Sequence, residues 1–294
     1  MKNNTAQNTP RPHSKADKAT LSTVSIDAAL LPCANTKKPS LTWPPFLPKK
    51  LTVDGVTYAA FGFGAQAAAY KAGECVGKVG HSFDQSRQLR QRAGDSVPDQ
   101  TARSNVDSFN QSVLLTAGHL TSGRLNPRLV ANARVDNQLR IWMDHTPAVE
   151  TIVVNPNAIA EYEPAKVKKL IDEFATFFLR SFKSGACDTE CSLFTNYGFF
   201  PTTKSLTCFD FGSITYDYTE ARKSVTGQVT AREIKRLLHG EIDPPNRDWP
   251  DWFYKGQVRE ALRPHPQLFN YYVAHMTEVV TLRALEQMWP KRYR

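Results

Sequence analysis

The chain has 294 residues, of which 41% are hydrophobic and 22% charged, with a formal net charge of +9 at pH 7. No stretch approaches the roughly 18 uninterrupted apolar residues of a membrane span, and five cysteines are too few and too scattered for a disulfide framework. The first residues lack the apolar core of a secretory signal. We therefore expect a protein of a reducing compartment such as the cytoplasm.

Residues 1–45 form a basic tail that is rich in Asn, Thr, Ser, Pro and Lys. Such a composition buries too little apolar surface to offset its ordering entropy, which predicts disorder. Residues 1–50 alone carry eight basic and two acidic side chains, so much of the positive charge lies outside the expected fold. No sustained basic helix with interleaved aromatic residues follows, and we expect no specific nucleic-acid partner.

Strand signals begin at residue 51. Residues 51–53 and 56–58 flank the turn dipeptide Asp54-Gly55. A small-residue segment over 61–70 leads into another strand, and 75–79 reads as the next. Each link is too short for a crossover helix, which predicts an antiparallel meander.

A polar segment over 82–105 predicts a helix followed by a flexible insertion. The next apolar residues share one helical face: Val106, Phe109, Val113 and Ala117. Segments 129–135 and 138–143 then predict a β-hairpin that turns at Asp136-Asn137.

After Pro147 the pattern becomes mainly helical. Pro164 opens a long amphipathic helix that ends at Gly185. A second hairpin is expected from 197–200 and 205–209, and helices from about 230 to the end. Because strands precede helices, we expect an α+β fold with two parts, 46–147 and 148–294.

Gly62 and Gly64 lie between two expected strands. Phosphate oxygens need close backbone approach and free N–H groups, and glycine permits both. Ala67 stands where a third glycine would complete the usual loop. A tight turn without a ligand is the alternative interpretation.

Lys78 lies in a short strand among small and apolar neighbours, 14 positions after Gly64. On the inner face of a strand a lysine needs an anion. Its alternative is simple exposure to water.

Asn196 and Asp210 bracket the second expected hairpin. Its geometry can bring an amide oxygen and a carboxylate together at the open end, and these ligands suit Mg²⁺. As an alternative, each side chain caps a turn.

The order of these features, ending in Asp210-Phe211-Gly212, resembles the protein-kinase family over residues 51–215. The resemblance implies a two-lobed α+β kinase-like fold, with a β-rich N-lobe and a mainly helical, reduced C-lobe. It also implies ATP and Mg²⁺ as cofactors.

By the same resemblance, Gly62 and Gly64 cover the nucleotide phosphates and Lys78 holds the α- and β-phosphates. Asn196 and Asp210 become the magnesium ligands. The 143–147 segment, beginning at Met143, resembles the hinge that meets the adenine through backbone groups.

The sequence departs from the family in two places. No glutamate occurs between Glu74 and Glu150 to pair with Lys78, and the intervening helix offers Gln111 or Asp107 instead. An amide holds an ammonium less firmly than a carboxylate does.

The second departure is the catalytic loop. Five positions before Asn196, where the family has its catalytic aspartate, stands Cys191. The nearest acids are Glu190 and Asp188, and either is a candidate base. Cys191 has no neighbour in sequence that would lower its thiol pKa, which favours a small buried residue over a nucleophile.

The resemblance leaves several functions open. One is a divergent kinase that transfers the γ-phosphoryl group of ATP to a protein Ser, Thr or Tyr hydroxyl. Others are a pseudokinase scaffold, or a transferase with a lipid, small-molecule or nucleotidyl-transfer reaction. The reduced design is similar to kinases that bacterial pathogens inject into host cells. This resemblance implies secretion into a host cell if the protein is such an effector, and a partner that is a protein substrate or regulator, host proteins included.

Overall fold

The computed structural model describes residues 42–149, 163–200, 203, 205–226, 236, 250–254 and 257–294. Its first part is a six-stranded sheet in the order β1-β2-β3-β4-β6-β5, and all neighbours are antiparallel. The strands are β1 (Lys50–Val53), β2 (Val56–Phe63), β3 (Ala67–Ala72), β4 (Cys75–Gly80), β5 (Arg134–Val135) and β6 (Ile141–Asp144).

Turn chemistry explains the first four strands. Asp54 and Gly55 both have positive φ, as does Gly73 between β3 and β4, so each turn uses residues that tolerate a left-handed backbone. The predicted antiparallel meander is therefore confirmed. A register shift between Ala60 and Gly62 marks an irregularity in β2 at the start of residues 62–67, the glycine loop. Gly62, expected between two strands, still lies in β2, where it pairs with Ala69.

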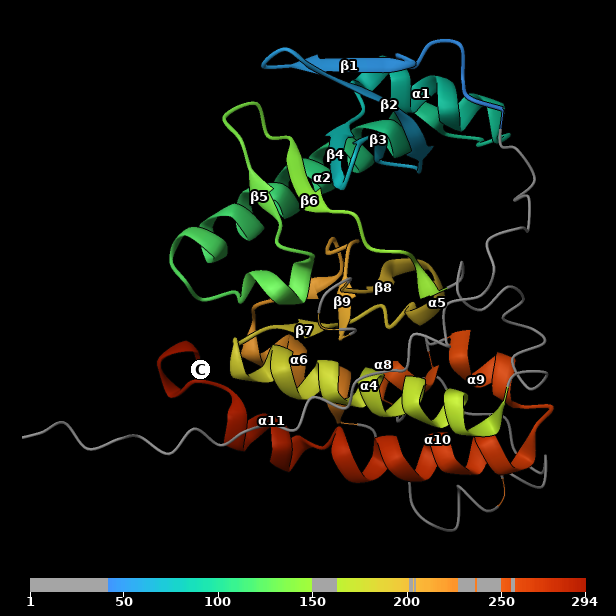
Figure 1. Ribbon diagram of the computed structural model, residues 1–294, viewed down its shortest axis with the longest axis vertical. Coiled ribbons are helices and arrows are strands. Elements are labelled where there is room, and N and C mark those ends of the chain that lie inside the picture. The colour runs from blue at the N-terminus through green and yellow to red at the C-terminus, as the bar shows by residue number, and fades with distance from the viewer. Residues whose placement is uncertain are drawn as a thin grey trace, which may run out of the picture.

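Two helices follow β4 and lie beside the sheet (Figure 1), α1 (Phe83–Arg92) and α2 (Pro98–Thr121). Ser82 and Gln85 form a capping box that starts α1, and Pro98 starts α2. The flexible insertion predicted up to residue 105 is wrong, because α2 already begins at Pro98. The predicted apolar face is confirmed at Phe109 and Val113, which are buried.

The strand predicted over 129–135 is also wrong in its first half. Residues Pro127–Val130 form a 3₁₀ helix that the Asn126 side chain caps. Ala131 and Asn132 follow with φ of 52° and 53°, a left-handed conformation that cannot continue into a strand. Only the two residues of β5 pair with β6.

The remaining described chain is mainly helical. Two small antiparallel sheets pair β7 (Cys187–Asp188) with β10 (Ile214–Thr215) and β8 (Tyr197–Phe199) with β9 (Leu206–Cys208). The helices are α4 (Pro164–Lys183), α5 (Leu193–Asn196), α6 (Tyr218–Val225), α8 (Asp251–Tyr254), α9 (Gln257–Leu262), α10 (Pro266–Val279), α11 (Leu282–Met288) and the short 3₁₀ helix Lys291–Tyr293.

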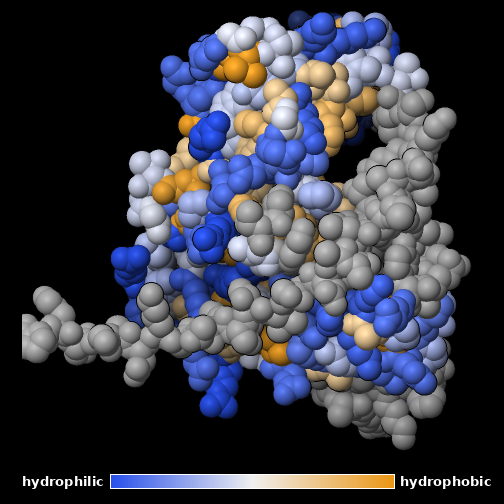
Figure 2. Space-filling view, in the orientation of Figure 1, coloured by the Kyte–Doolittle hydropathy of each residue, from blue (hydrophilic) through white to orange (hydrophobic). Residues whose placement is uncertain are grey.

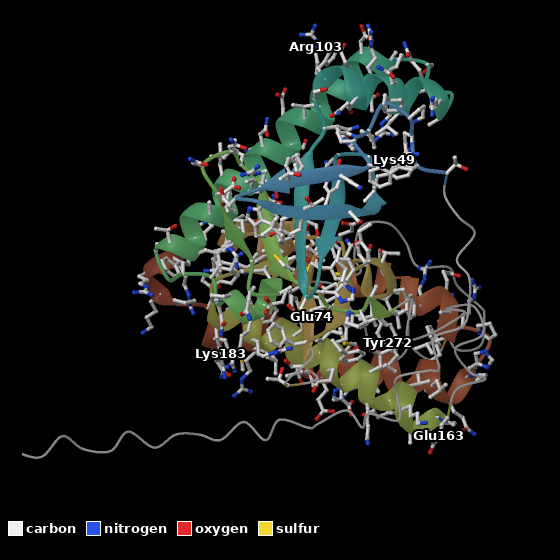
Figure 3. The ribbon with its side chains drawn as sticks, turned by 45° about the horizontal axis from the view of Figure 1, so that its top comes forward. Lys49, Glu74, Arg103, Glu163, Lys183 and Tyr272 are labelled. Atoms are coloured by element: carbon white, nitrogen blue, oxygen red, sulfur yellow. The ribbon has the colours of Figure 1, made fainter. Side chains whose placement is uncertain are left out.

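Helix α4 is the centre of this part. The predicted helix from Pro164 is confirmed, and Gly185 follows its end with φ of 66°. Its apolar face buries Phe174 and Phe177, and the Phe177 ring lies 4.8 Å from the ring of Tyr197 in β8. Figure 3 shows Glu163 and Lys183 marking the two ends of the helix. Burial of this aromatic face fixes β8 over α4.

The described chain is therefore an α+β fold with a sheet-rich part and a helical part that follow one another in sequence (Figure 1). On the face seen in Figure 2, hydrophilic residues predominate and hydrophobic ones are scattered. Within the described residues, no helix has the length and apolar character to cross a membrane. The predicted disordered tail lies outside the described residues up to residue 41, as do most of the turn at 201–204 and most of 227–249.

Candidate functional site

Lys78 and Asp210 meet where the sheet faces the helical part. The Lys78 ammonium lies 3.1 Å from an Asp210 carboxylate oxygen and donates to the carbonyl of Phe209 at 3.3 Å. The Lys78 side chain is 20% exposed, whereas that of Asp210 is 53% exposed. Lys78 therefore contacts an anion, and the alternative interpretation of its position in β4, simple exposure to water, does not hold.

The β8–β9 hairpin places Asp210. Tyr197 pairs with Cys208, and the next backbone hydrogen bond runs from the Phe209 N–H to the carbonyl of Asn196. Asn196 precedes one strand and Asp210 follows the other. Both residues therefore lie at the same end of the hairpin, as expected.

Asn196 is held by an acid of the preceding loop. Its side chain is 7% exposed, and its amide nitrogen donates to Glu190 at 3.0 Å while its amide oxygen accepts from the hydroxyl of Thr195 at 3.1 Å. Glu190 also accepts from the hydroxyl of Ser192 and is itself exposed. Glu190 is thus a solvent-accessible carboxylate fixed beside Asn196.

Asp188, the other candidate base, is only 1% exposed. Its carboxylate accepts the backbone N–H groups of Glu190 and Cys191 at 3.0 and 2.9 Å. It also accepts the hydroxyl of Ser213 at 2.8 Å and the phenol of Tyr197. With its acceptor capacity taken inside the protein, Asp188 ties the Glu190 loop to the segment after Asp210.

Burial raises the pKa of Asp188, although its four hydrogen-bond donors oppose that shift. Burial and the neighbouring Asp188 charge also raise the pKa of Tyr197 well above its ordinary value. The two groups form a closed buried network, which is a feature of structural hydrogen bonding. Sequence separation alone could not distinguish Asp188 from Glu190.

The fold itself does not require glycine at the predicted phosphate loop. A Cβ built on Gly62 or Gly64 would meet no atom within 4 Å, and neither residue has positive φ. By contrast, a Cβ on Gly77 would approach the Trp142 ring to 2.5 Å, so that glycine serves packing. Gly62 and Gly64 therefore have open space beside them, as a phosphate-binding loop would require.

The expected hinge lies where β6 leaves the sheet. Met143 is 4% exposed and pairs with Val76 of β4, two positions from Lys78. The chain then bridges to the hairpin, because Ala148 pairs with Gly198. A role for the Met143 backbone in binding adenine stays a prediction.

Neither substitute for the missing glutamate contacts Lys78 in the described structure. Asp107 and Gln111 are both exposed on α2. Gln111 borders a cavity of about 210 Å³ that also touches Phe211 and Gly212. No charged side chain lines this cavity, so it does not suit a phosphate, and Lys78 takes Asp210 as its partner instead.

Asp210 and Asn196 offer oxygen ligands of the kind that Mg²⁺ prefers. One Asp210 oxygen contacts Lys78, and no described residue takes the other. The Asn196 oxygen would be released by rotation of the Thr195 hydroxyl. Among the described residues no group of three His, Cys, Asp or Glu side chains gathers as a metal site, so any ion here would depend on these two ligands together with phosphate and water.

Two residues near the loop were not singled out from the sequence. His81 is 4% exposed, and its ring nitrogen Nε2 lies 3.0 Å from the carbonyl oxygen of Gly64. The Gln66 side chain reaches toward Gly212, with its oxygen 4.0 Å from the position of a Cβ there. The sequence signal that could have indicated His81 is its place directly after the strand that carries Lys78.

No protein-family model matches the chain, and no curated protein matches it either. Functional assignment therefore depends on the geometry of the site.

Proposed function

We propose that the protein is a divergent ATP- and Mg²⁺-dependent kinase that transfers the γ-phosphoryl group to a protein hydroxyl. The observation that carries the proposal is the 3.1 Å contact between Lys78 and Asp210, a cation and a partly exposed carboxylate brought together from 132 positions apart. Phosphoryl transfer depends mainly on positioning and on neutralising phosphate charge, and this pair supplies both signs.

The order of elements supports a kinase-like two-lobed fold. Strands β2 and β3 flank the glycine loop, β4 carries Lys78, two helices follow, and β5 and β6 complete the sheet. Helix α4 then leads to the loop of Asn196 and to the β8–β9 hairpin that ends at Asp210. The sheet-rich part corresponds to an N-lobe and the helical part to a reduced C-lobe.

Each residue of the site has a separate proposed role. Lys78 would exchange part of its contact with Asp210 for phosphate oxygens, and the free N–H groups of the glycine loop would approach the same phosphates. Asp210 and Asn196 would hold Mg²⁺, which when bound neutralises charge on the phosphate oxygens.

Glu190 is the base that we propose for the acceptor. Its exposed carboxylate accepts the proton of the hydroxyl group, whose oxygen forms the new bond to the γ-phosphorus. The bond from that phosphorus to the β–γ bridging oxygen breaks, and ADP leaves. Asp188 positions Glu190 through the Glu190 backbone N–H and is too buried to meet a substrate.

Transfer of radiolabelled γ-phosphate to a mixture of protein acceptors tests this function. The wild type is expected to label the acceptors, and the Lys78→Met and Glu190→Gln variants to lose at least 90% of that signal, since each removes a group that acts on the reacting phosphate or hydroxyl (about tenfold or more). Equal labelling by all three proteins would refute the proposal.

One observation favours a second candidate, a nucleotide-binding scaffold without transfer. Cys191 occupies the position of the family's catalytic aspartate, is buried, and has φ of 58°. Binding of Mg·ATP without any transfer, with and without acceptors, would select this alternative and keep the same nucleotide site.

A further inference from the structure

We infer that His81 is a positioning residue that orients the peptide groups of the glycine loop for phosphate binding. The inference rests on the proposed function, since it concerns how the same loop meets a triphosphate. It is carried by two hydrogen bonds that join His81 to opposite sides of the loop's turn.

The first bond fixes the peptide between Gly64 and Ala65. The buried ring of His81 lies with Nε2 3.0 Å from the Gly64 carbonyl oxygen. A carbonyl only accepts, so Nε2 carries the proton and donates. Burial lowers the pKa of His81, against the raising effect of this same bond, which favours a neutral ring with the proton on Nε2.

The second bond fixes the other side of the turn. The backbone N–H of His81 donates to the carbonyl of Gln66 at 2.9 Å, and Gly64 donates its own N–H to Ala67 at 2.9 Å. The carbonyls of Gly64 and Gln66 are thus both turned toward His81, where they cannot face an incoming anion and repel it.

Peptide geometry then determines where the N–H groups point. In a trans peptide the C=O of one residue and the N–H of the next point in opposite directions. Because Gly64 directs its carbonyl at His81, Ala65 must direct its N–H away from His81. Ala65 is exposed, and no described residue accepts a hydrogen bond from its N–H or from that of Gln66. These two donors are free for phosphate oxygens.

The anchor is rigid because β4 carries it. Lys78 lies on this strand, His81 follows it directly, and a Cβ on Gly80 would approach the Phe109 ring of α2 to 2.6 Å. The ammonium and the loop donors therefore belong to one packed unit. A loop ordered in advance loses less conformational entropy when it binds a ligand.

Calorimetric titration with Mg·ATP and with adenosine tests the inference on the full chain. His81→Phe removes the donor and keeps a ring, so we expect affinity for Mg·ATP to fall roughly tenfold while affinity for adenosine stays within about twofold. His81→Gln keeps a donor near the same place and is expected to bind Mg·ATP within about threefold of the wild type. His275→Gln on α10 is the matched control.

Ala65→Pro removes the proposed donor directly and keeps the test decisive if His81→Phe does not fold. It should lower affinity for Mg·ATP and leave that for adenosine unchanged. Equal loss for both ligands in His81→Phe, or unchanged Mg·ATP affinity in Ala65→Pro, would overturn the inference.

A wild type that binds no Mg·ATP would count against the proposed kinase function. Tripolyphosphate titration then decides the inference separately. Binding that His81→Phe weakens would keep the loop as an anion site, and absence of binding would reject it.

Discussion

The Lys78 ammonium and the Asp210 carboxylate lie 3.1 Å apart, although the first belongs to a central strand of the sheet and the second follows the β8–β9 hairpin. The Phe209 carbonyl accepts a second hydrogen bond from the same ammonium. One cation therefore joins the two parts of the chain at a place open to solvent, since more than half of the Asp210 side chain is exposed.

Substitutions in the glycine loop are expected to affect ligand binding but not folding. Gly62→Ala and Gly64→Ala add a methyl group where no atom lies within 4 Å, so the melting temperature should stay within about 2 °C of the wild type. Affinity for Mg·ATP should fall about tenfold or more, because the methyl group blocks close phosphate approach. Thermal denaturation and calorimetric titration measure the two effects.

Gly77→Ala is the matched control for this pair. Its new methyl group would collide with the Trp142 ring at 2.5 Å, so it should lower the free energy of unfolding by about 1–3 kcal/mol. If the two loop variants instead lose as much stability as Gly77→Ala, the loop glycines serve the fold and not a ligand.

Glu190 and Asp188 should respond oppositely to substitution. Glu190→Gln is expected to lower the rate of phosphoryl transfer by about 10²–10⁴-fold with little change in stability, because it removes the exposed carboxylate that we propose as the base. Asp188→Ala leaves its four donors without their acceptor and should lower the free energy of unfolding by about 3 kcal/mol or more. Urea denaturation and transfer rates check both variants; a stable, slow Asp188→Ala protein would reverse the two roles.

The free energy of unfolding is expected to depend on acid pH through the Asp136 carboxyl. Burial by itself raises the pKa of this carboxyl, but hydrogen bonds from Trp142 and Arg140, with further backbone donors, lower it to about 2. The folded pKa is below the unfolded one, so this stabilisation is present above pH ~4 and is lost as the pH falls toward 2.

Urea denaturation at several pH values measures that loss. Asp136→Asn is expected to be less stable than the wild type at pH 7 by about 1–3 kcal/mol, and the difference should shrink steadily below pH ~4. A difference that stays constant down to pH 2 would show that the charge of Asp136 does not stabilise the β5–β6 hairpin.

The buried thiols of the helical part are expected to be inert. Cys187, Cys191 and Cys208 are buried, and burial is the main cause that raises the pKa of Cys187 and Cys208. In a Cys33→Ser background, iodoacetamide should label Cys75 first, because it is the partly exposed one. Mass spectrometry follows the order in which the cysteines are labelled. Rapid modification of Cys191 in the folded protein would contradict this expectation and support a role for its thiol as a nucleophile.

Local sequence patterns predicted most of the strands and the main helix of the fold. Turn residues and the short strand runs between them located β1 to β4, and apolar spacing located α4, because these signals depend on neighbours within a few residues. The 3₁₀ helix at Pro127–Val130 was missed because apolar side chains suggested a strand, while the Asn126 cap and the left-handed Ala131 decided otherwise.

The candidate site was likewise predicted only in part from the sequence. Lys78, Asn196 and Asp210 could be named from their spacing, and the structure brings Lys78 and Asp210 together. The different environments of Asp188 and Glu190 arise from contacts with Ser213 and Asn196, which pattern does not reveal. His81 could not be identified from pattern either, because its contact is with the Gly64 carbonyl, 17 positions away.

Calorimetric titration of Mg·ATP into the wild type, Lys78→Met and Asp210→Asn tests the central claim most directly. The account predicts that the wild type binds, that Lys78→Met binds at least about tenfold more weakly, and that Asp210→Asn loses the dependence of affinity on Mg²⁺. No binding to the wild type at millimolar nucleotide, or equal affinity in all three proteins, would contradict it.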